Sequence, residues 1–493
     1  MPILSSNDYT KQHYHCQYLV IGSGPGGSVS SALLAEAGKN VILLEEGKYY
    51  DHRTFSTNTS KMTSQLYRNG GVFPFLGLPT VAFAEGCCVG GGSTINGGLL
   101  WRTPQNILRD WETKYKIKGY DNENLKQHFS TIEQDLHVIK HQVEKDSNID
   151  SLLLKEGAEL LNWETEMAPR AIKDCVNENL CATGCISGSK QSMLNTYIPR
   201  ALAKGATLFT ECRAIRICCA KNKAKKIIVK NNNQNKKFEI SFDHLVLAGG
   251  AIQTPHLLRK SKISKLAGQN LQFHMNLKIV ALFDKKIKAE QGTIFTVQVQ
   301  EFMNEGILIM ASNLNRTYLS MTLSHQKNHI INHVLDNYDK SAIYAAMIKP
   351  YSIAHIISCF GDKPLVWYSF NQKDLETIRN ALLKTGTVLF KSGAVELYLP
   401  VKGMPVIKSL AELEQQVCHL SVSKLELISV HAMASCPMGV SPDNSVVNCN
   451  GELWNMQNIL ITDASVLPTN IGESPQGTLM AFAHEIINRH LLI

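Results

Sequence analysis

A glycine-rich turn near the N-terminus narrows the possible folds more than any other stretch of the sequence. The short apolar run 18–21 indicates a buried parallel strand and leads into Gly22-Ser-Gly-Pro-Gly-Gly27, which fits the pattern G-x-G-x-x-G. The small residues 28–37 predict a helix that ends at Gly38. A second apolar run, 41–44, then leads into Glu45. The sequence therefore predicts a strand, a tight turn, a helix and a second parallel strand.

The residues of this unit suit the binding of a dinucleotide. Gly22 allows the tight turn, Gly24 lets the backbone approach a pyrophosphate, and Gly27 lets helix and strand pack closely. The N-terminus of the helix would face the phosphates, and Glu45 could accept hydrogen bonds from a ribose hydroxyl. A glycine-rich turn of some other α/β protein would leave the position of Glu45 unexplained. We therefore predict dinucleotide binding, although this unit alone does not choose between NAD and FAD.

Length, composition and charge place the unit in a larger globular chain. At 493 residues the chain is too long for one core of typical size, so we expect two domains. A hydrophobic share of 44% is enough for a sizeable core. The net charge of +8 is modest, and no recognition motif accompanies the basic stretch 221–237, which we interpret as a polar hairpin. We therefore expect no nucleic-acid partner.

The cysteines and the N-terminus favour a reducing compartment. The chain has 13 cysteines, and adjacent pairs such as Cys87-Cys88 cannot form a regular disulfide framework. The first 12 residues are polar and lack the apolar core of a secretory signal. We therefore expect a cytoplasmic protein with free thiols. No run of about 18 apolar residues predicts a transmembrane segment, and the sequence leaves peripheral membrane contact open.

A second glycine-rich stretch, residues 89–102, reads V-G-G-G-S-T-I-N-G-G-L-L-W-R, and we expect neither a regular strand nor a regular helix there. Its glycines would bring the backbone close to a flat or bulky group, and Asn96 offers an amide to a ring edge. This stretch resembles the first signature of the glucose–methanol–choline (GMC) oxidoreductases, in which it lies against the flavin of FAD. Three further segments resemble signatures of the same family and occur in its order: 248–258, 430–439 and 460–478.

Within that family the chain looks closest to oxidases of long-chain or bulky alcohols. Their cysteine-rich segment before a G-x-K-x-S stretch resembles Cys175, Cys181 and Cys185 followed by residues 188–192. The spacing of these cysteines fits no ordinary zinc or iron–sulfur pattern, so we expect no metal site.

The resemblance implies an α/β fold, α+β overall, with two domains. One is a discontinuous FAD-binding Rossmann domain of the glutathione-reductase type, expected in residues 1–110, 171–275 and 426–493. The other is a substrate-binding domain with a mostly antiparallel sheet and helices, expected in residues 111–170 and 276–425. Sequence patterns agree, because alternation in 293–299 and 307–311 predicts strands and 374–392 has the spacing of an amphipathic helix.

The resemblance also implies the oxidation of an alcohol. A hydride would pass from carbon to the flavin N5 while the hydroxyl loses its proton, and histidine suits the role of proton acceptor. His431 matches the catalytic histidine of the family. Where the family has a second His or Asn, this chain has Ser474, whose hydroxyl reaches less far. Ser474 could act through a water, Asn470 or another group could replace it, or the chemistry could be altered.

The remaining expected site residues bind FAD. They are Gly22, Gly24, Gly27, Glu45, Gly91, Gly92, Ser93, Asn96, Gly97, Gly98, Ala214, Asp463, Ala464, Gln476 and Thr478. Some family members tether the flavin through a histidine where this chain has Thr94 and Ile95, so we expect non-covalent FAD. The expected partners are a bulky or apolar alcohol and an electron acceptor, either dioxygen or a quinone-like carrier. Two alternatives stay open: lyase or decarboxylase chemistry on the same fold, and a flavin-binding protein without turnover.

Overall fold

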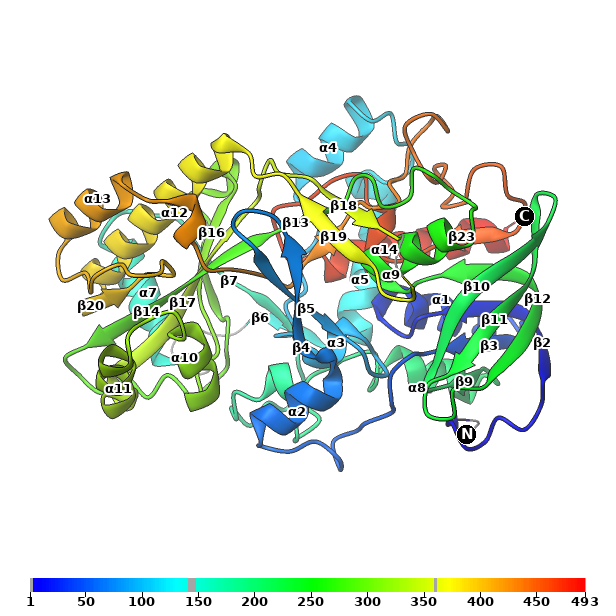
Figure 1. Cartoon of the computed structure of the whole chain (residues 1–493), viewed down its shortest axis with the longest axis horizontal. Coiled ribbons are helices and arrows are strands. Elements are labelled where there is room, and N and C mark those ends of the chain that lie inside the picture. Colours follow the sequence, from blue (N-terminus) through cyan, green and yellow to red (C-terminus); the bar gives the residue numbers. More distant parts are fainter. Residues whose placement is uncertain (1–2, 141–147, 359–360, 493) are drawn as a thin grey trace.

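The computed structural model describes residues 3–140, 148–358 and 361–492, and its first layer is an eight-stranded sheet. Strand β2 (His13–Ile21) lies between the parallel strands β3 (Val41–Leu44) and β12 (Lys237–Leu247), and helix α1 (Pro25–Glu36) connects β2 to β3. The predicted strand–turn–helix–strand unit is thus confirmed, and it lies at the right of Figure 1. The other strands of this sheet are β1 (Ile3–Leu4), β9 (Thr207–Phe209), β10 (Cys212–Ala220), β11 (Lys223–Asn231) and β23 (Ile459–Ile461).

The basic stretch forms hairpins, as the sequence predicted. Strand β11 pairs antiparallel with both β10 and β12, and residues 232–236 turn between β11 and β12. Lysine side chains alternate with buried apolar ones along β11, because successive residues of a strand point to opposite faces. The positive charge is therefore spread along an exposed strand face.

The second layer is an eleven-stranded, largely antiparallel sheet. Its centre consists of β14 (Met275–Phe283), β17 (Ser341–Ile348) and β16 (Ile307–Ala311), paired antiparallel in that order. The strand expected at 293–299 is shorter, since only Val297–Val299 (β15) pairs with β16. The other strands of this sheet are β4 (Tyr67–Leu76), β5 (Val81–Gly86), β7 (Thr165–Met167), β18 (Ala354–Ile357), β19 (Leu365–Tyr368), β20 (Ala394–Tyr398) and β21 (Leu427–Ser429).

Strands β4 and β5 come from the first piece expected to belong to the FAD-binding domain, yet they pair within this larger sheet. The domain boundaries given above stay a prediction. Two short sheets complete the strands: β6 (Val138–Lys140) with β8 (Pro169–Ala171), and β13 (Gln272–Phe273) with β22 (Ala432–Met433).

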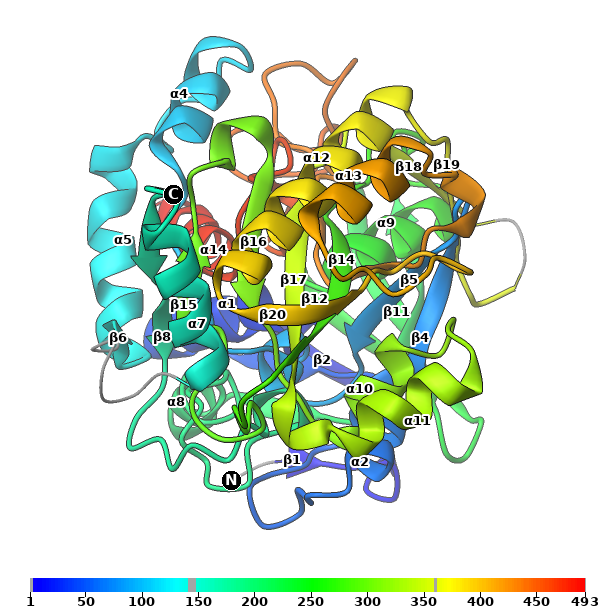
Figure 2. The same cartoon turned by 90° about the vertical axis from the view of Figure 1, so that its left-hand side faces the viewer.

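Helices cover both sheets. Figure 2 shows α12 (Gln372–Lys391) and α13 (Leu410–Cys418) in front of the larger sheet, and α12 is the amphipathic helix that the sequence predicted. Helix α14 (Gln476–Leu491) packs against α1 beside the smaller sheet. The remaining helices are α2 (Thr59–Leu66), α3 (Gly92–Ile95), α4 (Gln105–Thr113), α5 (Asn122–Asp135), α7 (Ile149–Glu159), α8 (Tyr197–Ala203), α9 (Gly250–Lys260), α10 (Arg316–Thr322) and α11 (Asn328–Asp336).

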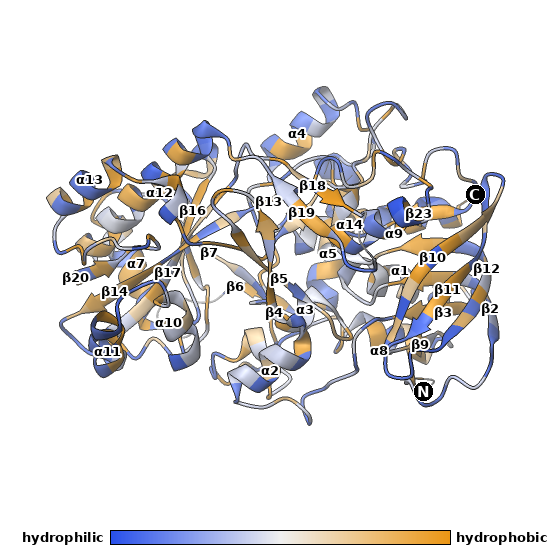
Figure 3. Ribbon diagram, viewed as in Figure 1, coloured by the Kyte–Doolittle hydropathy of each residue, from blue (hydrophilic) through white to orange (hydrophobic). Residues whose placement is uncertain are grey.

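Each sheet has its own hydrophobic core. One core joins the N-terminal sheet to α1 and α14, and the other joins the larger sheet to α7, α12 and α13. Figure 3 shows hydrophobic residues concentrated in the strands, whereas α12 and α13 carry both hydrophobic and hydrophilic residues. A small separate cluster, Leu308, Met310, Ala345 and Met347, lies in strands β16 and β17. Among the residues described, no helix combines the length and the apolar character that a membrane span requires.

Candidate active site

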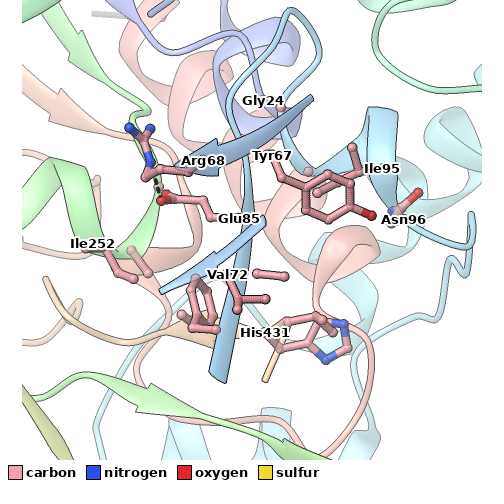
Figure 4. Close-up of a pocket in the computed structure, with 18 of the residues that line it drawn as sticks. Gly24, Tyr67, Arg68, Val72, Glu85, Ile95, Asn96, Ile252 and His431 are labelled. Atoms are coloured by element: carbon pink, nitrogen blue, oxygen red, sulfur yellow. Dashed lines mark hydrogen bonds and ion pairs between the residues drawn. The ribbon is translucent and has the colours of Figure 1, made fainter. Parts of the chain in front are cut away.

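A continuous cavity of about 930 Å³ is lined from both sheets. Figure 4 shows residues from distant parts of the chain around it, among them Gly24, Asn96 and His431. Fourteen of the expected site residues line it: Gly22, Gly24, Glu45, Gly91, Gly92, Ser93, Asn96, Gly97, Ala214, His431, Asp463, Ala464, Ser474 and Gln476. Gly27, Gly98 and Thr478 do not line the cavity.

The glycines of the first turn differ in what surrounds them. A Cβ atom on Gly27 would lie 1.8 Å from the carbonyl oxygen of Gly22, so helix and strand pack too closely there for any side chain. A Cβ atom on Gly24 would meet nothing within 4 Å. Gly24 lines the cavity at the N-terminus of α1, where backbone N–H groups favour an anion. This open cradle fits the pyrophosphate of a dinucleotide.

Glu45 is held rigidly beside that turn. Its Oε2 atom accepts hydrogen bonds from the Ser23 backbone N–H (3.0 Å) and hydroxyl (2.6 Å), and its Oε1 atom accepts from the Gly47 N–H (2.8 Å). Burial raises the pKa of this carboxyl, and the three donors oppose that effect. Glu45 thus presents a fixed acceptor group to the cavity at the end of β3.

The second glycine-rich stretch forms a short helical turn, α3, where we expected no regular structure. A Cβ atom on Gly91 would lie 2.9 Å from the Cα atom of Gly24, so this stretch closes directly onto the first turn. A Cβ atom on Gly92 would meet nothing within 4 Å, and Gly92 lines the cavity. The stretch therefore presents bare backbone to the cavity beside the cradle at Gly24.

A buried lysine holds this stretch in place, and sequence reasoning did not assign it a role. The Lys190 ammonium donates to the carbonyl oxygens of Thr94 (2.6 Å), Asn96 (3.0 Å) and Cys181 (2.5 Å). Burial lowers the pKa of Lys190 to about 8. The G-S-K-Q-S stretch was the available signal, since its lysine follows the buried cysteines 181 and 185 closely in the chain.

Two contacts tie the C-terminal segments to the rest of the cavity wall. The Asn96 amide donates to Oε1 of Gln476 (2.6 Å), at the start of α14. The Asp463 carboxylate accepts from the Thr254 hydroxyl (2.5 Å) and from the Gly250 N–H (2.9 Å), at the start of α9. The segments 89–102, 248–258 and 460–478 therefore form one connected wall.

A group of three charged residues that the sequence did not point to lies on β4, on β5 and just after β3. The Arg68 guanidinium pairs with Glu85 (2.6 Å) and with Glu46 (2.9 Å), and all three residues line the cavity. Figure 4 shows the pair of Arg68 and Glu85 at the cavity wall.

His431 pairs with a second histidine that the sequence did not point to. Strands β13 and β22 pair antiparallel, with Gln272 opposite Met433 and Phe273 opposite Ala432. The same register brings His274 opposite His431, and their Nδ1 atoms lie 2.9 Å apart. Burial lowers the pKa of His431 to about 4 and that of His274 well below its usual value, so both rings are neutral at neutral pH.

The hydrogen bonds of Asn470 decide which nitrogen carries each proton. Its Nδ2 atom donates to the Phe273 carbonyl (2.7 Å), and its Oδ1 atom accepts from the Gly472 N–H (2.9 Å). Oδ1 is also 2.5 Å from Nε2 of His274, so that nitrogen must be the donor. Nδ1 of the neutral His274 then accepts from Nδ1–H of His431. This leaves a lone pair on Nε2 of His431, which lines the cavity.

Ser474 also lines the cavity, but no hydrogen bond joins it to His431 among the described residues. Its backbone N–H donates to the Glu473 carboxyl (2.7 Å). Burial raises the pKa of Glu473 to about 8, so this cavity-lining carboxyl is protonated at neutral pH. The partner of His431 is therefore His274, held in turn by Asn470, one of the groups that the sequence had suggested as a replacement.

The fold and the cavity together suit a protein that binds a dinucleotide, and a buried histidine pair lies at the cavity wall. The N-terminal and C-terminal sequence models of the GMC oxidoreductase family match residues 63–276 and 362–483, which is more than half of the chain. The chain therefore belongs to the GMC oxidoreductase family, of which FAD is the typical cofactor. It is a GMC-type oxidoreductase, and the predicted family and fold class are confirmed.

The similar proteins include an uncharacterized member of the family and oxidases of different substrates. An uncharacterized GMC-type oxidoreductase of Sinorhizobium fredii is 28% identical over 95% of this chain and 93% of its own length. A long-chain-alcohol oxidase of Arabidopsis thaliana is 26% identical over 95% of this chain and 67% of its own length. Among solved structures, a pyridoxine 4-oxidase superposes with a TM-score of 0.76 at 17% identity, covering 97% of this chain and 99% of that one. The last likeness shows the shared fold.

Proposed function

We propose that this GMC-type oxidoreductase removes a hydride from the CH–OH group of an alcohol, with His431 as the proton acceptor. The observation that carries the proposal is the hydrogen-bonded chain from Asn470 through His274 to Nδ1 of His431, which leaves Nε2 of the cavity-lining His431 free to accept a proton. A base at this place takes the hydroxyl proton as the C–H bond breaks, which makes the alcohol a better hydride donor. FAD, when bound, supplies the hydride acceptor.

The chain's own groups divide the remaining work. Gly24 and Gly92 leave room for the cofactor, and Glu45, Asn96, Gln476 and Asp463 fix the walls around it. Ala214, Ala464 and Ser93 line the same cavity and belong to the proposed cofactor site. Burial keeps His431 neutral across the physiological pH range, so one ring nitrogen is unprotonated before the reaction.

We propose that FAD is bound non-covalently. The Thr94 hydroxyl donates to the Val89 carbonyl (2.8 Å), so the side chain at this position serves the local backbone. Neither Thr94 nor Ile95 carries a ring nitrogen that could form a covalent link to the flavin.

We further propose an apolar alcohol as the substrate class. Beyond His431 the cavity is lined by side chains such as Phe295, Met310, Ile343 and Met347, which favour a hydrocarbon chain. Long-chain-alcohol oxidases and a cholesterol oxidase among the relatives support this class. The electron acceptor, dioxygen or a quinone-like carrier, and the cytoplasmic setting stay predictions.

The test is an absorbance spectrum of the purified protein followed by anaerobic addition of single alcohols. We expect flavin bands that denaturation releases into solution and that an apolar alcohol bleaches, with the aldehyde or ketone as product. Flavin that stays with the denatured chain would contradict the non-covalent site. Cleavage products in place of aldehyde or ketone would favour lyase or decarboxylase chemistry, and flavin that no alcohol reduces would favour a binding protein without turnover.

A further inference from the structure

A lysine stands on the cavity face of the larger sheet, among apolar side chains. Lys278 on β14 lies opposite Ala345 on β17, which lies opposite Met310 on β16. Side chains directly opposite one another across paired strands point to the same face of a sheet. All three residues line the cavity, and Met310 and Ala345 belong to the small cluster that is separate from the main cores. Lys278 is thus a cation in an apolar wall.

The ammonium of Lys278 has hydrogen-bonding capacity to spare. Its Nζ atom lies 2.7 Å from Oγ of Ser312, which in turn donates to Oδ1 of Asn313 (3.2 Å). Ser312 therefore accepts one of the three ammonium hydrogens, and two are left over. Within the described ranges 3–140, 148–358 and 361–492, Lys278 forms no ion pair with a carboxylate. Burial alone lowers the pKa of Lys278, to about 8, and no nearby charge contributes.

Lys278 is partly exposed in the cavity, where water can reach its ammonium group. When an apolar substrate fills the cavity, the charge loses this hydration and gains little in return unless the substrate brings a counter-charge. Other carboxyl groups line the same cavity, Glu426 and Glu473 among them, but within the described ranges none forms an ion pair with Lys278. An anion brought in by the substrate would supply both the missing charge and acceptors for the two free hydrogens.

The strand also sets the backbone distance between Lys278 and the histidine pair. His274, which contacts His431, immediately precedes β14, and Lys278 is four residues further along. At about 3.3 Å per residue this corresponds to roughly 13 Å between the two backbone positions. Met347 and Ala345 on the neighbouring strand line the cavity beside this path.

We propose that Lys278, with Ser312 and Asn313, binds an oxyanion such as a carboxylate at the far end of the substrate. The substrate is then an apolar chain with a hydroxyl group at one end and an anionic group at the other. This inference rests on the proposed alcohol oxidation for the hydroxyl end alone, because the binding of the anion does not require turnover.

The test compares matched compounds on the flavin-loaded protein at pH 7. The turnover probes are 10-hydroxydecanoate and 1,10-decanediol, which differ in the group at the far end. The binding probe is decanoate, which has no hydroxyl group to oxidise, measured by titration calorimetry. The variants are Lys278→Met, which removes the charge and keeps most of the side-chain length, and the control Lys384→Met. In the wild type the Lys384 ammonium pairs with Glu305 outside the cavity.

We expect the wild type to favour 10-hydroxydecanoate in kcat/KM by about tenfold or more, as a hydrogen-bonded charge pair implies. Lys278→Met should abolish this preference and weaken decanoate binding by a similar factor, while Lys384→Met keeps both. Oxidation of both probes with no dependence on Lys278 would refute the anion site and leave alcohol oxidation standing. Decanoate binding that depends on Lys278, without oxidation of any alcohol, would refute the proposed reaction and support the anion site.

Discussion

Replacing His274 tests the claim that it fixes the proton on His431. His274→Leu removes the acceptor of the His431 Nδ1–H, whereas His274→Asn keeps one, because Oδ1 of Asn occupies the place of the ring Nδ1. When His431 takes the substrate proton it becomes a cation, and its bond to His274 becomes a bond to a charged donor. Such bonds contribute about 1.5–3 kcal/mol. Their loss in the transition state predicts a fall in kcat of roughly 10- to 150-fold for His274→Leu.

The assay is the rate of anaerobic flavin reduction by an alcohol that bleaches the wild type. We expect His274→Asn to keep most of the rate. The KM of both variants should change little, because His274 does not line the cavity. Flavin content and the thermal midpoint report whether each variant is folded. Equal losses in the Leu and Asn variants, or full activity of a flavin-loaded His274→Leu, would refute the reasoning.

Three further predictions concern the cofactor site and the buried ionisable groups. Gly24→Ala should fold with an unchanged thermal midpoint but bind less FAD, whereas Gly27→Ala should lose about 3 kcal/mol or more of stability to a backbone clash, measured by urea unfolding. Lys190→Met should cost about 2–5 kcal/mol, because buried carbonyls lose their donor, and the flavin yield should fall with it. Burial lowers the pKa values of His431 and His484 to about 4, so the unfolded chain binds protons at these rings more readily than the folded chain. The stability that they contribute should be full above about pH 6.5 and should fall by up to about 1.4 kcal/mol per pH unit for each histidine between about pH 6.5 and pH 4, measured as the free energy of unfolding in urea at a series of pH values.

The sequence could predict those parts of the site whose residues are close together in the chain and whose local structure follows from the same residues. The turn at Gly22 to Gly27 needs only a strand before it and a helix after it, and both periodicities are visible in the residues themselves. The glycines at 91 and 92 are likewise readable as bare backbone, although the short turn α3 was not expected. Lys190 was hidden because a buried lysine is distinguished from an exposed one only by what packs around it.

The sequence has Ser474 where the family has a second His or Asn, and it could not predict which residue pairs with His431. The structure gives the reason. The histidine pair depends on the register of two strands, each two residues long and separated by some 160 positions, and no local pattern encodes such a pairing. Asn470 could be suspected from its closeness to Ser474 in the chain, but its part is to orient His274 and not to contact His431. A second polar group beside His431 is therefore present, supplied by the residue that follows β13 in place of the C-terminal segment. If His274 serves in place of the family's second polar group, the Ser474 hydroxyl is not needed for the reaction. Ser474→Ala should then retain substantially more activity than His274→Leu in the same flavin-reduction assay.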